Sequence, residues 1–113
     1  MIRGIDGEQV QLRLILSESR THDGQPLYKR IVDVLRAEGL AGATVLKGVA
    51  GFGPDSIIHQ ASLLRLSADL PLVIEVVDTQ EHLDAVLPEV DRMMGGGLIT
   101  MEKVRVVRYE QGG

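Results

Sequence analysis

The fold is decided by residues 10–17, which read Val10-Gln11-Leu12-Arg13-Leu14-Ile15-Leu16-Ser17. Aliphatic side chains at every even position alternate with mostly polar ones at the odd positions. This period of two is typical of a β-strand that has one face on a hydrophobic core. We therefore predict a strand over 10–17 whose even-numbered side chains are buried.

A helix is predicted to follow over 26–38. The intervening residues 17–25 contain no apolar side chain and are expected to form a loop. Pro26 suits the first helical position, because its missing N–H has no partner to lose there. Gly39 is expected to end the helix, since glycine readily adopts the positive φ of a helix C-terminus. The apolar stripe of this helix consists of Leu27, Ile31, Val34 and Leu35.

The second half of the chain predicts a similar alternation. A second helix is expected to start at Asp78, because Asp78 and Glu81 have the spacing of an N-cap and the third helical residue. Pro88 should kink or break this helix, and the glycines at 95–97 should end it. Strands are expected over 43–50, 70–77 and 104–109. Residues 56–66 fit a helix and a strand about equally well.

The composition of the 113 residues excludes several classes of protein. Without Cys there is no disulfide framework and no thiolate zinc site. A net charge of −4, with one Phe, two Tyr and no Trp, argues against a nucleic-acid binder. The N-terminus lacks the pattern of a signal peptide, and no apolar run is long enough to span a bilayer. We expect one cytoplasmic domain over 1–113, without a nucleic-acid partner or membrane insertion.

The expected order of elements predicts the fold class. Two strand–helix–strand halves joined by a long loop are typical of an α+β, ferredoxin-like βαββαβ sandwich, with the long loop between strands two and three. Both helices then cover one face of an antiparallel sheet. The bare face mixes apolar and charged side chains, so we expect it to be covered in an oligomer. The side chains placed on this bare face are Ile15, Val73, Val77, Val107, Gln11, Arg13, Glu75 and Arg105.

Two glycine clusters, at residues 48–53 and 95–97, are candidate ligand sites. Glycine lets backbone N–H groups approach a phosphate closely. The first cluster is neither a P-loop nor a dinucleotide fingerprint, because Pro54 directly follows Gly53. A flexible hairpin end explains this cluster without a ligand, and a slack helix end explains the second.

Charged and nucleophilic side chains give weaker signals. Arg105 and Arg108 could clamp a phosphate or carboxylate, and ion pairs with Glu75 or Glu102 are the alternative. No motif pairs a nucleophile with a base, so no catalytic residue is assigned. No metal site is expected within one chain, because the histidines lie far apart at His22, His59 and His82.

Three stretches carry a family resemblance, which extends from about Val10 to Tyr109. They read His22-Asp23-Gly24-Gln25-Pro26-Leu27-Tyr28, Ala41-Gly42-Ala43-Thr44-Val45-Leu46-Lys47-Gly48-Val49-Ala50-Gly51-Phe52-Gly53 and Leu70-Pro71-Leu72-Val73-Ile74-Glu75-Val76-Val77-Asp78. The chain resembles a bacterial and archaeal family of uncharacterised PII-like proteins, which is related to the nitrogen-regulatory PII proteins.

The resemblance implies a homotrimer that binds nucleotides in clefts between subunits. The ligand would be a small anion such as ATP, ADP or AMP. The lysine that follows the glycine turn in PII proteins is Leu98 here, which weighs against ATP. The implied ligand-binding residues are Lys47, Gly48, Gly51, Gly53, Gly95, Gly96, Gly97, Arg105 and Arg108.

The resemblance also implies that the loop over 50–66 contacts a protein target such as a transporter or an enzyme. The tyrosine that PII proteins have modified in this loop has no counterpart between Gly51 and Leu66, which argues against uridylylation. The implied contact residues are Phe52, Pro54, Asp55, Ile57, Ile58 and His59.

Three functions therefore stand as hypotheses. The leading one is a non-enzymatic regulator that binds a small anion and presents the 50–66 loop to a partner. The second is a module that docks on its partner without a ligand, which the missing lysine favours. The third and least favoured is an enzyme whose active site assembles between subunits from Asp55, His59 and Arg105.

Overall fold

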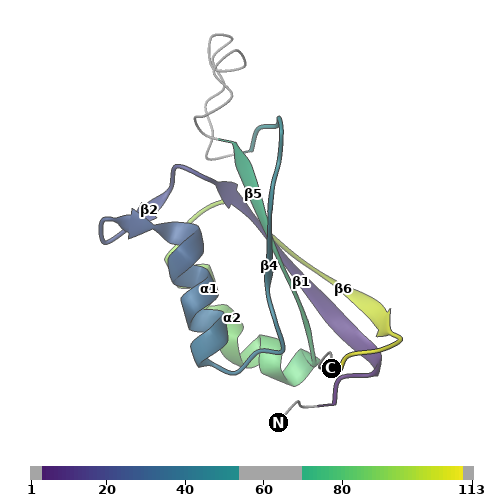
Figure 1. Ribbon diagram of the computed structural model, residues 1–113. Coiled ribbons are helices and arrows are strands. Elements are labelled where there is room, and N and C mark those ends of the chain that lie inside the picture. The colour runs from purple at the N-terminus through teal and green to yellow at the C-terminus, as the bar shows by residue number, and fades with distance from the viewer. Residues whose placement is uncertain (1–3, 54–69, 111–113) are drawn as a thin grey trace.

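The computed structural model describes residues 4–53 and 70–110 (Figure 1). The elements in chain order are β1 (Gly7–Ser17), β2 (Thr21–His22), β3 (Gln25–Pro26), α1 (Leu27–Ala37), β4 (Thr44–Lys47), β5 (Pro71–Asp78), α2 (Gln80–Met94) and β6 (Leu98–Val106). The prediction that residues 56–66 form a helix or a strand lies outside the described residues.

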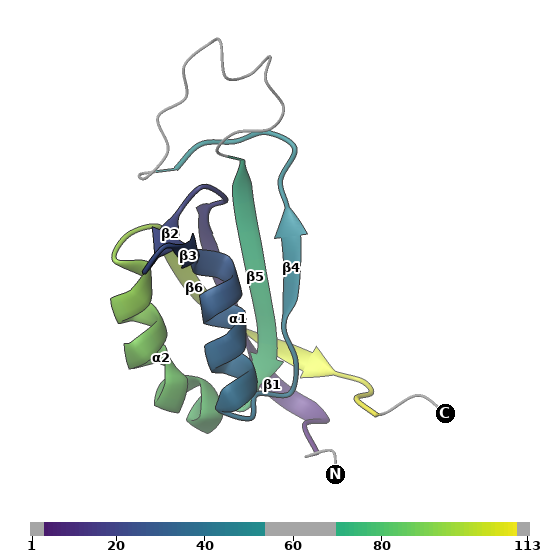
Figure 2. The same ribbon diagram turned by 60° about the vertical axis from the view of Figure 1, so that its left-hand side comes forward.

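Four of the strands form one antiparallel sheet in the order β4-β5-β1-β6. α1 and α2 lie side by side on one face of this sheet, and no described element covers the other face (Figures 1 and 2). Each helix connects two strands that have one strand between them. The α+β, ferredoxin-like arrangement predicted from the sequence is confirmed.

The hydrophobic core lies between the helices and the sheet. The even-numbered side chains of β1 from Val10 to Leu16 are buried, as the alternation predicted, and Leu12 and Leu14 are completely inaccessible. Burial of each aliphatic side chain of this size contributes about 1.5–3 kcal/mol. The other core side chains are Leu72, Ile74 and Val76 of β5, Leu27, Ile31 and Leu35 of α1, and Leu83, Val86, Val90 and Met94 of α2.

The sequence misplaced the ends of several strands. β6 begins at Leu98 and ends at Val106, whereas the pattern predicted 104–109. The reason is pairing, because β1 offers partners from Gly7, opposite Val106, to Ile15, opposite Leu98. β4 is shorter than the predicted 43–50 and ends at Lys47.

The stretch predicted as a plain loop, 17–25, contains part of a short hairpin of β2 and β3. Asp23 (φ 52°) and Gly24 (φ 77°) occupy its turn. Two consecutive positive φ angles are typical of the type I′ turn that closes a two-residue hairpin. The hairpin was missed because its strands carry no alternating apolar side chains.

The helix ends agree with the sequence in part. Pro26 precedes α1 as its N-cap residue, and Gly39 has the expected positive φ of 78°. α2 is capped by Thr79, whose hydroxyl accepts a hydrogen bond from the backbone N–H of His82, so the prediction of Asp78 as N-cap was wrong. α2 continues through Pro88 without a break and ends at Gly95, which has φ 63°. Among the described residues, neither helix is long and apolar enough to cross a membrane.

We expect Gly48→Ala to lower the free energy of unfolding by about 1–3 kcal/mol, measured by urea denaturation. A Cβ at Gly48 would lie 2.8 Å from Cγ of Pro71 and 3.3 Å from the Pro71 carbonyl oxygen. The matched control is Gly42→Ala, where an added Cβ meets no atom within 4 Å. This control should change the free energy by less than about 0.5 kcal/mol. Equal losses in the two variants would contradict the steric explanation.

Candidate functional site

Both glycine clusters lie at the same end of the sheet, which we call the glycine end (residues 47–53 and 95–97). At this end Lys47 is opposite Leu72 on β5, and Leu98 is opposite Ile15 on β1. The ammonium group of Lys47 lies 3.1 Å from the carboxylate of Glu18.

The first cluster has a structural reason for two of its glycines. The backbone N–H of Gly48 donates to the carbonyl oxygen of Pro71 at 2.8 Å. A Cβ at Gly51 would lie 3.2 Å from the Pro71 ring, and Gly51 has φ 150°. Close packing on Pro71 therefore explains Gly48 and Gly51 without a ligand.

The second cluster ends α2 and turns the chain into β6. Gly95 and Gly97 have φ angles of 63° and 91°, which side chains with a Cβ rarely adopt. The guanidinium group of Arg20 donates to the carbonyl oxygen of Met94. A positive charge at this position stabilises the C-terminus of a helix.

The two predicted arginine contacts lie at the opposite end of β6. Arg105 is opposite Glu8 and lines a hollow of about 380 Å³ with Lys103. The guanidinium Nε of Arg108 lies 3.3 Å from the carboxylate of Glu110. At about 3.4 Å per residue, the two ends of β6 are roughly 27 Å apart. Within one chain, the structure therefore does not bring the arginines to the glycine end.

The uncovered face of the sheet, which we call the open face, carries two rows of side chains. An apolar row crosses all four strands through Leu46, Val73, Ile15 and Leu98. A polar row beside it contains Thr44, Glu75, Arg13 and Thr100.

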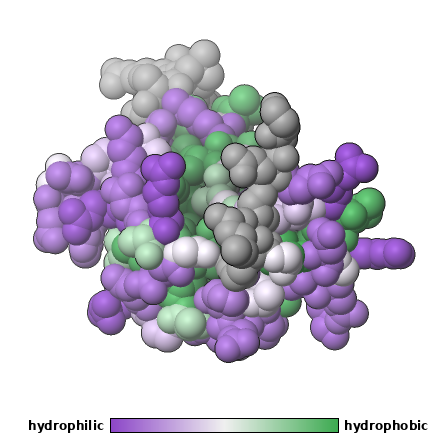
Figure 3. Space-filling view, turned by 60° about the horizontal axis from the view of Figure 1, so that its bottom comes forward, coloured by the Kyte–Doolittle hydropathy of each residue, from purple (hydrophilic) through white to green (hydrophobic). Residues whose placement is uncertain are grey.

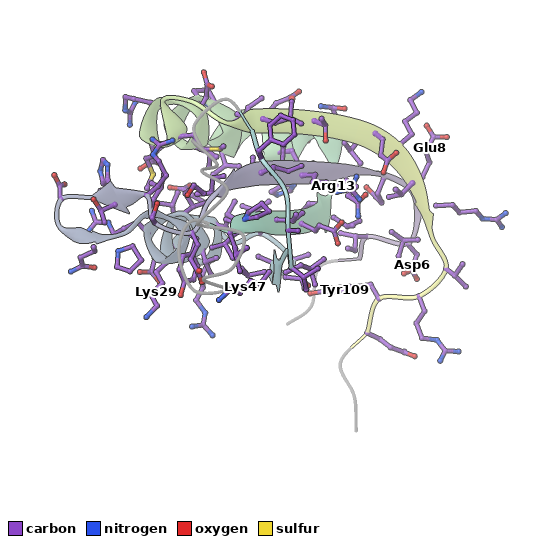
Figure 4. The ribbon with its side chains drawn as sticks, turned by 90° about the horizontal axis from the view of Figure 1, so that it is seen from above. Asp6, Glu8, Arg13, Lys29, Lys47 and Tyr109 are labelled. Carbon is purple, nitrogen blue, oxygen red and sulfur yellow. The ribbon has the colours of Figure 1, made fainter. Side chains whose placement is uncertain are left out.

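An ion pair occupies the centre of the polar row, where Arg13 is labelled in Figure 4. Arg13 donates to one carboxylate oxygen of Glu75 from Nε at 3.0 Å and from Nη2 at 2.7 Å. Glu102 lies 3.9 Å from the same guanidinium group. Arg13 is therefore the arginine beside Glu75 and Glu102. The sequence analysis had offered these two acids as alternative partners of Arg105 and Arg108.

One part of the predicted bare face was wrong. Arg105 is opposite Glu8, and Glu8 has the same parity as the buried Val10, so Arg105 belongs to the side of the sheet that carries the helices. Val107 follows the end of β6 and is exposed. The face of Arg105 is set by the register of β6 against β1, and Val107 was misplaced because β6 ends at Val106.

A buried network that the sequence did not predict lies at the other end of the sheet, near Arg108. The carboxylate of Asp78 is completely buried and accepts hydrogen bonds from the backbone N–H groups of Ala41 (2.8 Å) and Thr79 (2.7 Å). The hydroxyl of Tyr109 donates to the carbonyl oxygen of Ala41 at 2.5 Å, and the Tyr109 backbone N–H donates to Asp6. This network joins the loop before β4 to both α2 and the C-terminal segment. The sequence contains one signal for the burial of Asp78, because this residue continues the series of even-numbered, buried positions of β5.

The network borders a hollow of the open face, which measures about 450 Å³. Its lining includes Gln11 and Glu75 of the sheet, the loop over 41–44, and Arg108 and Tyr109. Within residues 4–53 and 70–110, no three His, Asp or Glu side chains gather closely enough to hold a metal ion. The ring Nδ1 of His82 lies 2.6 Å from the Thr79 hydroxyl, a contact within the first turn of α2.

The predicted partner loop is only partly described. Phe52 is 82% exposed, and Val49 is 85% exposed. Gly53 lies at the end of the described stretch. The other predicted contact residues are outside the described residues: Pro54, Asp55, Ile57, Ile58 and His59.

Comparison with solved structures defines the class of fold. The chain is similar to CPII from Thiomonas intermedia K12 bound to ADP, AMP and acetate, with a TM-score of 0.64, 17% identity, and coverage of 90% of this chain and 91% of that chain. A second structure of CPII, described as a nitrogen regulatory PII-like protein bound to ADP, AMP and bicarbonate, has the same TM-score of 0.64 at 16% identity. The fold is thus the PII-like, ferredoxin-type fold.

The chain belongs to the DUF190 family, described as "Uncharacterized ACR, COG1993", whose model matches residues 9–106. It is 36% identical over 96 residues to a UPF0166 protein of Aquifex aeolicus, which covers 85% of this chain and 90% of the relative. It is also 36% identical over 100 residues to a UPF0166 protein of Methanocaldococcus jannaschii, covering 88% of this chain and 92% of the relative. The resemblance stated from the sequence is confirmed.

We expect Asp78→Ala to lower the free energy of unfolding by about 1–3 kcal/mol, because it leaves the partly buried N–H groups of Ala41 and Thr79 without their acceptor. The exposed carboxylate of Asp91, also near an end of α2, gives the control Asp91→Ala. Thermal and urea unfolding should show a change of less than about 0.5 kcal/mol for this control. If Asp78→Ala were as stable as the control, the network would have no stabilising role.

Proposed function

We propose that this protein is a non-enzymatic, PII-like regulator. It acts as a homotrimer, binds a small anionic ligand, an adenine nucleotide, in clefts between subunits, and contacts a protein target through the loop over 50–66. The main support for this proposal is the distance between the glycine end and the two arginines, Arg105 and Arg108. A ligand that contacts both groups must lie between two copies of the chain.

Assembly is supported by the open face. Its apolar row has one member on each of the four strands, and Leu46 and Leu98 at the two edges are 47% and 49% exposed. A continuous apolar strip of this kind is stabilised when another protein surface removes it from water. The neighbouring Arg13–Glu75 ion pair gives this face a polar centre that favours one docking orientation. The number of copies follows the resemblance to PII proteins.

The ligand assignment rests on chemistry at both ends of β6. The proposed contacts from one copy are Lys47, Gly48, Gly51, Gly53, Gly95, Gly96 and Gly97, and those from a neighbouring copy are Arg105 and Arg108. The ammonium group of Lys47, a glycine backbone without side chains in the way and two guanidinium groups suit the phosphates of a nucleotide. CPII, which shares the fold, was solved with ADP and AMP, and this supports the choice of adenine nucleotides as probes.

A second candidate function is supported by Leu98. This aliphatic side chain stands where PII proteins have a lysine, and it lies in the apolar row of the open face. A chain without this lysine could dock on a partner without a nucleotide. The exposed Val49 and Phe52 at the start of the loop provide apolar contacts for either function.

The structural roles of three polar side chains, Thr79, His82 and Asp78, support the proposal of a non-enzymatic function. The Thr79 hydroxyl and His82 form the N-terminal cap of α2. The buried Asp78 carboxylate is bound to backbone N–H groups. In the described ranges these groups stabilise the fold.

We expect the protein to sediment at about three times its chain mass of 12.3 kDa. Ile15→Glu places a charge in the centre of the apolar row and should produce monomers. The control Ala85→Glu changes an exposed position on α2 and should leave the mass unchanged. Circular dichroism should confirm that both variants are folded. A parent protein that sediments as a monomer at micromolar concentration would contradict the trimer.

We also expect ADP or AMP at 100 times its Kd to stabilise the native state by about 2.7 kcal/mol, measured by thermal denaturation. Arg105→Ala should weaken binding about tenfold or more, because it removes a charge-assisted contact to phosphate. The control Arg92→Ala removes an exposed arginine from the last turn of α2 and should bind normally. If ATP, ADP and AMP all leave the melting temperature unchanged, the ligand-free docking function is the better description.

A further inference from the structure

The hollow of about 450 Å³ on the open face combines apolar walls with a few polar groups. Val77 and Val106 supply apolar surface, and the side chains of Gln11, Glu75 and Arg108 supply polar groups. Small-molecule sites are typically hollows of roughly 300–1,000 Å³ with this kind of lining. The end of the sheet where α1 meets β4 faces the viewer in Figure 3, and apolar surface shows there between hydrophilic side chains.

The side-chain amide of Gln11 has a fixed orientation beside this hollow. Nη2 of Arg13 donates to the amide oxygen of Gln11 at 3.2 Å. A guanidinium group has only donors, so the oxygen of the amide, and not its nitrogen, faces Arg13. The NH₂ group of Gln11 therefore remains as a donor, and within residues 4–53 and 70–110 it has no hydrogen-bond partner.

The carboxylate of Glu75 is bound through only one of its oxygens. Both hydrogen bonds from Arg13 go to Oε2, at 3.0 and 2.7 Å. Oε1 has no hydrogen-bond partner in the described part of the chain, and the side chain is only 25% exposed. Because Nη2 of Arg13 binds both Glu75 and Gln11, the two side chains lie next to each other. The hollow thus has one donor beside one acceptor in its lining.

A ligand that satisfies both groups must have an acceptor and a donor along one edge. Adenine has this edge, since its 6-amino group lies beside a ring nitrogen that accepts hydrogen bonds. Guanine also has an acceptor, O6, but the two groups that follow it along the same edge are both donors. Only Oε1 of Glu75 is open to accept, so one donor of guanine would lose its hydrogen bond to water without replacement. The pair Gln11 and Glu75 therefore favours adenine.

The surroundings of the pair suit a nucleotide. The aliphatic side chains of Val77 and Val106 offer apolar surface to the faces of a base. Arg108 lines the same hollow, and its side chain is 78% exposed, so its charge lies near the solvent and within reach of a phosphate. The apolar row lies on the other side of the ion pair, because Val73 precedes Glu75 on β5 and Val77 follows it.

We propose that this hollow binds the adenine base of the nucleotide. Gln11 donates to a ring nitrogen of the base, and Oε1 of Glu75 accepts from its 6-amino group. This assignment rests on the proposed function and places the base on the copy that supplies Arg108, so that the phosphates extend toward the glycine end of a neighbouring copy. Gln11 and Glu75 then determine the specificity for adenine, while the cations bind phosphate.

The first test measures AMP binding to the full chain by isothermal titration calorimetry. Gln11→Met should weaken AMP binding about tenfold, because the base loses its donor. Ribose 5-phosphate, which has no base, should bind this variant within about twofold of the parent. The matched control is Gln9→Met, which changes the preceding residue on the same face of β1, outside the lining of the hollow, and should bind AMP normally.

The second test measures the choice between bases. The parent should bind AMP about tenfold or more tightly than GMP. Glu75→Gln replaces the open acceptor with a donor, while its amide oxygen can still accept from Arg13. This variant should lose most of the preference for AMP. Circular dichroism and sedimentation check that each variant has the fold and mass of the parent.

The third test locates the base directly by NMR. With methyl-labelled valine, the adenine protons H2 and H8 should show nuclear Overhauser effects to the methyl groups of Val77 and Val106. Adenosine, which has no phosphate, should bind more weakly than AMP and show the same contacts.

These results separate the adenine site from the proposed function. If the parent binds AMP, but binds GMP equally well or is unaffected by Gln11→Met, the base lies elsewhere and the adenine site is wrong, while the nucleotide function stands. If the parent does not bind AMP, the ligand part of the proposed function fails. Adenosine then decides the hollow alone, because its contacts to Val77 and Val106 would support the adenine site and their absence would overturn it.

Discussion

The structure depends on the pairing register of β1, the central strand that bonds to both β5 and β6. With this register, Leu12 and Leu14 point at the helices while Arg13 and Ile15 point away. A slip of one residue would expose the leucines and bury the arginine, because side chains in a strand alternate between faces. The core, the open face and the positions of both helices therefore follow from one set of backbone hydrogen bonds.

Much of the fold could be predicted because its signals are local. The alternation at 10–17 and the stripe from Leu27 to Leu35 state which side chains are buried, and Gly39 and Gly95 mark where the helices end. Errors occurred where the limits of an element depend on contacts with another part of the chain. β6 extends back to Leu98 because Ile15 offers a pairing partner, and no property of Leu98 alone states this. The N-cap of α2 moved from Asp78 to Thr79 because the Asp78 side chain is buried at the end of β5.

The candidate site was less predictable, since glycine has more than one use. Gly48 and Gly51 pack on Pro71, and Gly95 and Gly97 adopt backbone angles that need glycine, so these four residues have structural reasons of their own. The sequence alone also gives no distances between residues that are far apart in the chain. Only the structure shows that Arg105 lies a full strand length from the glycine end, and that Tyr109 reaches Ala41.

The position of β1 also has a consequence for synthesis on the ribosome. Among the described elements this strand is made first, and its partner β6, Leu98–Val106, is made last. Both edges of β1 can be bonded only after residues 18–106 have been made. Pairings between such distant segments slow folding, and they leave aliphatic surface accessible to chaperones or to other nascent chains in the meantime.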